Sequence, residues 1–102
     1  MPEIVTIGSA AELPPGERAV IEIGSHAIVV FNVDNRYYAI EDLCTHDDGP
    51  LADGELDGLI IECPRHGAQF DISSGAVRRL PAVKPVPRYE IRVVDGQLQI
   101  VL

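Results

Sequence analysis

The chain has 102 residues, 46% hydrophobic and 24% charged, which predicts a single globular domain with a modest core. Sixteen acidic and eight basic residues give a net charge of −8, which argues against nucleic acid and anionic membranes as partners and favours a basic protein surface. No apolar run approaches the ~20 residues that cross a bilayer, and the N-terminal residues lack the features of a secretion signal. We therefore expect a cytoplasmic protein. A monomer is assumed, because the sequence does not determine the oligomeric state.

The first part of the chain carries the signals of a β-meander. Residues 17–24 and 26–33 are rich in β-branched side chains and meet at Gly24-Ser25, which predicts a tight hairpin. A second turn at Asp34-Asn35 leads into a third strand. No segment of the chain keeps a 3.6-residue hydrophobic period over ten positions, so little helix is expected.

Residues 43–83 differ in character and contain the residues with metal-binding chemistry. Their short apolar pieces are interrupted repeatedly by glycine and proline, which predicts loops. Both cysteines and two of the three histidines lie here, in the pattern C-x-H, sixteen residues, C-x-x-H: Cys44, His46, Cys63 and His66. Each half of the pattern offers one thiolate and one imidazole to an inorganic centre.

Two kinds of centre fit this ligand set. One Zn²⁺ ion would accept two sulfurs and two nitrogens in a tetrahedron and act as a structural clip. A [2Fe–2S] cluster would take both cysteines on one iron and both histidines on the other. Zinc motifs usually separate their first ligands by about two to four residues. Cys44 and His46 have one residue between them and must diverge, which favours ligands to different irons. A zinc-bearing interaction module without redox activity is the alternative.

The C-terminal residues carry the clearest hairpin signal. In residues 88–102, apolar and polar side chains alternate on both sides of an Asp95-Gly96 turn. The preceding residues 81–88, PAVKPVPR, are expected to be extended and polyproline-like. The predicted fold class is therefore all-β, with an antiparallel β-sandwich base from residues 1–42 and 84–102 and a loop-rich subdomain inserted at about 43–83.

The motif CTH at 44–46 and the motif CPRHGAQFD at 63–71 closely resemble the motif pair of Rieske proteins. Gly75 and a proline loop at 80–82 extend the resemblance, which covers the whole chain. It implies one Rieske-type domain, residues 1–102, that binds one [2Fe–2S] cluster per chain.

The resemblance also implies a role for each ligand. Cys44 and Cys63 would bind the buried iron. His46 and His66 would bind the outer iron, whose imidazole edges offer the electron a way out. Gly49 and Gly67 would let backbone N–H groups approach the sulfurs, although both glycines are equally compatible with simple turns.

Other positions distinguish this chain from the Rieske proteins of respiratory and photosynthetic complexes. Those proteins join their cluster loops through two further cysteines, where this chain has Gly49 and Arg65. They also place serine and tyrosine hydroxyls beside the sulfurs, where this chain has Ala68 and Phe70. Fewer donors to sulfur and the nearby acidic residues predict a potential near the lower end of the Rieske range, ~−150 mV. The acidic residues are Glu41, Asp42, Asp47, Asp48, Asp53, Glu55, Asp57 and Glu62.

The remaining residues argue against catalysis by the chain itself. Only His26 is left for a mononuclear iron site, which usually needs two histidines and a carboxylate, so His26 is interpreted as a turn or strand-edge residue. No G-x-G-x-x-G motif offers a dinucleotide site.

The chain is similar to the ferredoxin component of bacterial aromatic-ring-hydroxylating dioxygenase systems. That similarity implies a one-electron carrier between a flavin-dependent ferredoxin reductase and a terminal Rieske oxygenase with a non-haem iron site. Service to a nitrite reductase or to iron–sulfur assembly is the alternative role for the same fold.

Overall fold

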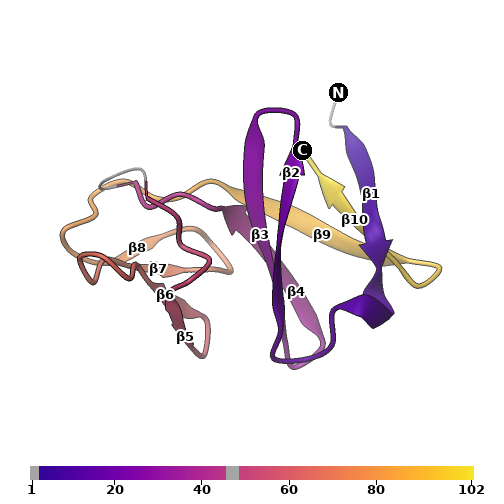
Figure 1. Ribbon diagram of the computed structural model, residues 1–102, viewed down its shortest axis with the longest axis horizontal. Helices are drawn as coiled ribbons and strands as arrows, with labels where there is room; N and C mark the ends of the chain where they lie inside the picture. Colours follow the sequence, from indigo (N-terminus) through magenta and orange to yellow (C-terminus); the bar gives the residue numbers. More distant parts are fainter. Residues whose placement is uncertain (1–2, 46–48) are drawn as a thin grey trace.

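The computed structural model describes residues 3–45 and 49–102, which form ten strands and one short 3₁₀ helix (Figure 1). In chain order these are β1 (Ile4–Ser9), η1 (Ala10–Glu12), β2 (Arg18–Ile23), β3 (His26–Val33), β4 (Arg36–Glu41), β5 (Glu55–Asp57), β6 (Ile60–Glu62), β7 (Gln69–Asp71), β8 (Val77–Arg79), β9 (Arg88–Val94) and β10 (Gln97–Val101). No helix within these described ranges is long and apolar enough to cross a membrane. The predicted all-β fold is confirmed.

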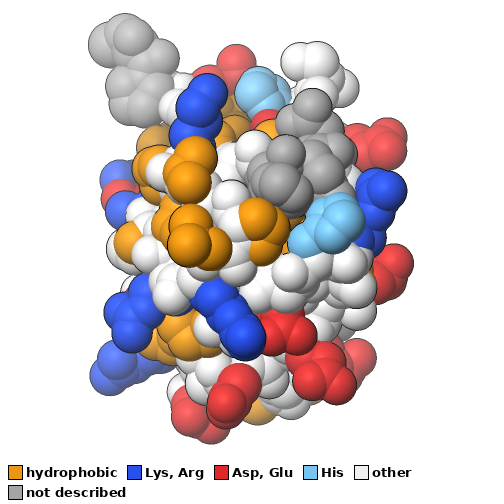
Figure 2. All heavy atoms as spheres, turned by 90° about the vertical axis from the view of Figure 1, so that its left-hand side faces the viewer, with side chains coloured by type: hydrophobic (Ala, Val, Ile, Leu, Met, Phe, Trp, Pro, Cys, Tyr) orange, Lys and Arg blue, Asp and Glu red, His pale blue; other side chains and the backbone are white. Residues whose placement is uncertain are grey.

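The strands form two antiparallel sheets. The base is a six-stranded sheet in the order β1-β10-β9-β4-β3-β2, and the inserted subdomain is a four-stranded sheet in the order β5-β6-β7-β8. The small sheet occupies one end of the molecule (Figure 1), the end that Figure 2 views directly. β4 and β9 pair through only two residue pairs, so two three-stranded halves enclose a core between them. That core consists of Leu13, Ile28, Val30, Ala39, Leu98 and Ile100.

Strand β3 is buried on both faces, which explains its almost continuous apolar sequence. Successive side chains of a strand point to opposite sides. Ile28 and Val30 belong to the core of the base, whereas Val29 and Phe31 pack in a second core with the subdomain. β3 is therefore the wall between the two cores.

The three predicted turns are confirmed by their backbone angles. Gly24 has a φ of +60°, Asp34 and Asn35 have φ values of +53° and +67°, and Asp95-Gly96 has values of +51° and +75°. Two-residue hairpins need such positive angles because their twist then matches that of the flanking strands. These turn residues therefore determine how the strands connect in the meander β2-β3-β4 and in the hairpin β9-β10.

The structure contains strands that sequence reasoning did not single out. β1 pairs with β10 at the far end of the chain, with a register shift between Thr6 and Gly8. The region 43–83, expected to be loop-rich, contains the four strands β5 to β8 of three residues each. A three-residue strand is too short for its alternation to stand out in sequence.

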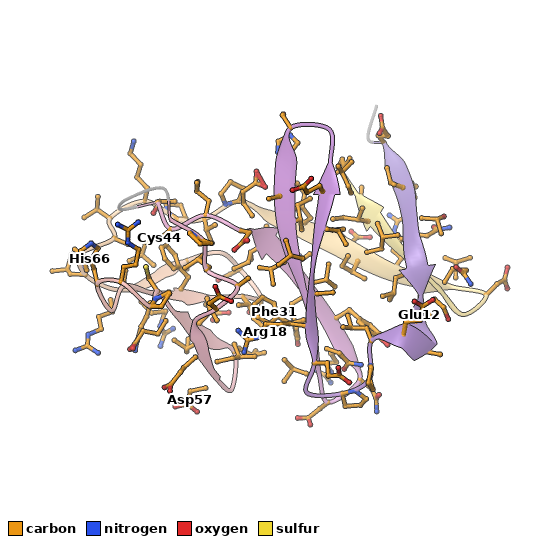
Figure 3. The ribbon with its side chains drawn as sticks, viewed as in Figure 1. Glu12, Arg18, Phe31, Cys44, Asp57 and His66 are labelled. Carbon is orange, nitrogen blue, oxygen red and sulfur yellow. The ribbon has the colours of Figure 1, made fainter. Side chains whose placement is uncertain are left out.

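The side chain of Arg18 joins the base to the subdomain. From β2 its Nη1 donates hydrogen bonds to the carbonyl oxygens of Ala52 (2.9 Å) and Gly54 (2.7 Å). Its guanidinium carbon lies 5.3 Å from the ring centroid of Phe31 on β3, and Figure 3 shows the two side chains together. One cation thus satisfies two carbonyl groups of the subdomain loop and stacks on a buried ring.

We expect Arg18→Met to lower the free energy of unfolding by about 2–3 kcal/mol, because it removes two charge-assisted hydrogen bonds while retaining an apolar stem. The midpoint of thermal unfolding should fall by roughly 10–20 °C. Circular dichroism of the cluster-loaded protein, at one scan rate, measures it. Arg36→Met, at the exposed start of β4, is the matched control and should shift the midpoint by no more than about 3 °C. Equal shifts in the two variants would contradict the role given to Arg18.

Candidate metal centre

Both cysteine side chains lie in the core that β3 shares with the subdomain. Cys44 is three residues beyond β4, and Cys63 directly follows β6. Their side chains are 0% and 1% exposed. The same core contains the apolar side chains of Leu51, Ile61, Ala68, Phe70 and Ile72. An inorganic group held by these two sulfurs would therefore be shielded from water on its inner side.

The two cysteines begin loops with the same backbone closure. The N–H of Cys44 donates to the carbonyl oxygen of Gly49 (2.6 Å), and the N–H of Cys63 donates to that of Ala68 (2.7 Å). Each bond reaches the carbonyl five positions later, so the ends of each loop meet at the core. Gly67 turns the second loop back with a φ of +75°, a conformation that glycine adopts at little cost.

His66 lies at the exposed side of the second loop. Pro64, Arg65 and His66 are exposed, while Cys63 and Ala68 at the two ends of the loop are buried. Figure 3 places His66 at the end of the molecule and Cys44 deeper, toward the base. The predicted ligand His46 lies outside the described residues, as do Asp47 and Asp48.

A third segment, residues 80–86, packs on the two loops. The hydroxyl of Thr45 donates to the carbonyl oxygen of Lys84 (2.6 Å), and the Ala82 side chain is buried in the core that holds both cysteines. The N–H of Val86 donates to the carbonyl of Gly75 (2.9 Å). A Cβ at Gly75 would lie 2.1 Å from the carbonyl oxygen of Val86, so this close approach requires glycine.

Some of the acidic residues near the loops are internal acceptors. Asp42 accepts hydrogen bonds from the backbone N–H groups of Leu51 (2.7 Å) and Ala52 (2.8 Å), which fixes the start of the segment that follows the first loop. Glu62 accepts from the side-chain amide of Gln69 (2.9 Å). Sequence reasoning treated both carboxylates as part of a general acidic field. No local pattern distinguishes them, because their donors lie seven to ten positions away.

A second carboxylate network lies at the start of β3. The Nδ1 of His26 is 2.8 Å from a carboxylate oxygen of Glu41, and the hydroxyl of Tyr89 donates to the other oxygen at 3.3 Å. Burial of the ring, followed by the nearby Glu41 carboxylate, raises the pKa of Tyr89. His26 begins its strand next to a turn, as expected, but its partners were not foreseen.

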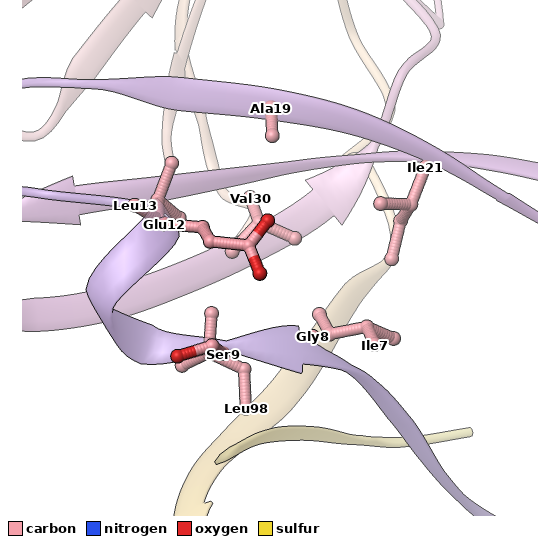
Figure 4. Close-up of a pocket in the computed structure, with 9 residues that line it drawn as sticks. All are labelled: Ile7, Gly8, Ser9, Glu12, Leu13, Ala19, Ile21, Val30 and Leu98. Carbon is pink, nitrogen blue, oxygen red and sulfur yellow. The ribbon is translucent and has the colours of Figure 1, made fainter. Parts of the chain in front are cut away.

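A pocket of about 170 Å³ lies in the base, between β1 with η1 and β2 with β3. Its walls are mainly apolar, and the carboxylate of Glu12 extends across it (Figure 4). No cysteine or histidine is among its lining residues. This pocket is separate from the cysteine loops.

Comparison with known proteins decides which centre the loops hold. Residues 3–90 match the Rieske [2Fe-2S] domain family. The chain is 36% identical over 93 residues to ferredoxin CarAc of Metapseudomonas resinovorans, covering 90% of this chain and 87% of that protein. It is 35% identical over 94 residues to the anthranilate 1,2-dioxygenase ferredoxin subunit of Burkholderia cepacia, covering 92% and 87%.

The chain is a Rieske-type [2Fe–2S] ferredoxin. Its fold agrees: a chain in the solved complex of reduced oxygenase and oxidized ferredoxin in carbazole 1,9a-dioxygenase superposes with a TM-score of 0.88 at 32% identity. That match covers 95% of this ferredoxin and 91% of the other chain. The protein is thus an electron-transfer component and not itself an enzyme.

The cofactor of this ferredoxin is a [2Fe–2S] cluster, so the single-zinc alternative is wrong. The side chains present fit that group. Two buried cysteines belong to one apolar core, and an imidazole lies outside them at the end of the molecule. Within residues 3–45 and 49–102, no three Cys, His, Asp or Glu side chains are placed to hold one metal ion.

Hydroxyl groups introduced beside the sulfurs should raise the reduction potential. Ala68 and Phe70 are both fully buried in the core of the cysteines, and their side chains have no group that could donate to sulfur. A donor stabilises the reduced cluster more than the oxidised one, and a one-electron couple shifts by about 60 mV for each tenfold of such preference. We expect Ala68→Ser and Phe70→Tyr each to raise the potential by roughly 20–60 mV, measured by protein-film voltammetry.

Ala39→Ser is the matched control, because Ala39 is equally buried but lies in the core of the base. Its potential should stay within about 10 mV of the unmodified protein, since its new hydroxyl is remote from both sulfurs. An unchanged or lower potential in both Ala68→Ser and Phe70→Tyr would refute the role given to the missing hydroxyls.

Proposed function

We propose that Cys44 and Cys63 bind the inner iron of the cluster, and that His46 and His66 bind the outer iron. The burial of both cysteines and the exposure of His66 support this assignment. Sulfur ligands on the inner iron keep thiolate charge away from water, while imidazole ligands at the surface offer a short route for the electron.

We further propose that the ferredoxin accepts one electron from a flavin-dependent reductase and delivers it to a terminal non-haem iron oxygenase. The observation that carries this proposal is the match, over 92% of this chain and 87% of the relative, to a ferredoxin subunit named as part of a dioxygenase, the anthranilate 1,2-dioxygenase ferredoxin subunit. The cluster, when bound, supplies the one-electron couple. The core excludes water around the sulfurs, and the tip of the second loop, at His66, remains accessible to a partner.

The absence of hydroxyl side chains at positions 68 and 70 supports a potential near ~−150 mV, low in the Rieske range. Such a potential suits a carrier that lies between a flavin and an oxygenase. The proposed setting is the cytoplasm, where the cysteines stay reduced until the cluster is inserted, and the proposed state is a monomer.

The ligand assignment predicts different consequences for two histidine substitutions. His66→Ala should lose the cluster or change its visible and EPR spectra, because an iron ligand is removed. His26→Ala is the control and should retain about two irons and two acid-labile sulfides per chain, since its partner is Glu41. Loss of the cluster from the His26 variant with retention in the His66 variant would show that the wrong histidine was assigned.

The proposed role predicts which acceptor protein reoxidises the reduced ferredoxin fastest. Reduced ferredoxin, mixed without air with purified acceptors in a stopped-flow instrument, should be reoxidised faster by dioxygenase oxygenase components than by a nitrite reductase. The bleaching and return of the visible absorption follow the reaction. Faster reoxidation by the nitrite reductase would replace the oxygenase with that partner, and no reoxidation by any acceptor would remove the carrier role.

A further inference from the structure

Positive charge is concentrated in one stretch of an otherwise acidic chain. Residues 63–88 contain five of the eight basic residues and one of the sixteen acidic ones, a net charge of +4 in a chain of −8. The five are Arg65, Arg78, Arg79, Lys84 and Arg88. The one acid, Asp71, accepts hydrogen bonds from the backbone and hydroxyl of Ser73, and that hydroxyl holds its pKa below the usual value.

The register of the small sheet brings part of this stretch to the second cluster loop. Glu62, Gln69 and Arg79 lie side by side across β6, β7 and β8. One step further along the sheet, the N–H of Cys63 bonds the carbonyl of Ala68. The residue that follows Arg79 therefore leaves β8 at the level of the loop that begins with Cys63.

The segment then crosses to the first loop with Ala82 facing inward and two larger apolar side chains facing outward. Ala82 is 1% exposed and packs in the core of the cysteines, whereas Leu80 and Val83 are 71% and 76% exposed, the highest values among the exposed large hydrophobic residues. Lys84 meets the first loop through the hydroxyl of Thr45. Residues 80–84 thus bridge the two loops and present two apolar side chains to solvent.

Figure 2 shows the types of side chain at this end of the molecule. In Figure 2, hydrophobic side chains gather next to a histidine, Lys and Arg side chains border them, and Asp and Glu side chains lie mostly toward the lower and right-hand edges. Arg78, Arg79 and Lys84 are exposed. The Nη1 of Arg79 lies 3.9 Å from a carboxylate oxygen of Glu62, a distance at which an exposed pair contributes little.

We propose a docking face for the electron-accepting protein, with Leu80 and Val83 at its centre and Arg78, Arg79 and Lys84 at its border. The matching surface of the partner would have an apolar centre surrounded by acidic side chains. The proposal rests on the proposed function. The two apolar side chains contribute desolvation, and the three cations orient the partner at the end where His66 is exposed. The net charge predicts a basic partner, but 13 of the 16 acidic residues lie in residues 1–62, so the docking face and the whole chain differ in sign.

Small oxidants of opposite charge test the sign of this face without a known partner. In each reaction one electron passes from the reduced ferredoxin to the oxidant. Anionic Fe(III)–EDTA is reduced to Fe(II)–EDTA, and cationic hexaammineruthenium(III) is reduced to hexaammineruthenium(II). An electron that leaves beside a basic patch makes the Fe(III)–EDTA rate fall with added salt and the ruthenium rate rise. If the electron instead leaves through an acidic face, the Fe(III)–EDTA rate rises with added salt and the ruthenium rate falls.

Charge-removing variants show which basic residues cause the salt dependence of these rates. The triple variant Arg78→Gln, Arg79→Gln, Lys84→Gln should slow Fe(III)–EDTA by about five- to tenfold at low ionic strength and speed the ruthenium oxidant several-fold. The double variant Arg36→Gln, Arg92→Gln loses charge from the base and should stay within about twofold. Leu80→Ser with Val83→Ser, which keeps every charge, should also stay within about twofold for both small oxidants.

A Fe(III)–EDTA rate that rises with salt, or a triple variant no different from the base variant, would overturn the docking face and leave the carrier role intact. A correctly loaded protein that reduces neither oxidant would instead overturn the carrier role, and the docking face with it. Retention of the iron content and visible spectrum in the triple variant separates a change of charge from damage to the cluster.

Discussion

Two cysteine side chains are buried in one apolar core, and the backbone and polar side chains around them are arranged to permit that burial. Cys44 and Cys63 start loops that close on their own backbone five residues later. Loops placed against a core must still satisfy their backbone polar groups. Arg18 satisfies two carbonyl groups and Asp42 two N–H groups of the segment that follows the first loop. Polar side chains from the base therefore position the loops.

Burial also distinguishes the cysteine side of the proposed centre from its histidine side. The sulfurs lie in a core that β3 borders, while the tip of the second loop, at His66, is open to solvent. An electron carrier needs both properties, since a shielded centre resists water and an exposed ligand shortens the path to a partner. The fold provides them through a buried first position and an exposed fourth position in C-x-x-H.

Charge has to be considered by location in this ferredoxin. A net charge of −8 describes how the molecule behaves at long range. The docking contact that we propose depends on the residues around Leu80 and Val83, where basic side chains prevail. Summing charges along the chain hides this difference, because 13 of the 16 acidic residues lie in residues 1–62, whereas residues 63–88 carry a net charge of +4.

The amino-acid sequence by itself determined the features that depend on neighbours in the chain. The hairpin turns at Gly24-Ser25 and Asp95-Gly96 follow from residues that accept positive φ angles, and the four-ligand pattern was sufficient to indicate a [2Fe–2S] centre. Only the tertiary structure decided that β3 faces two cores, that β1 joins β10, that Asp42 and Arg18 turn inward, and that Leu80 and Val83 turn outward. Each of these features depends on a contact between segments that are far apart in sequence. Local residue patterns carry no information about the free energy of such contacts.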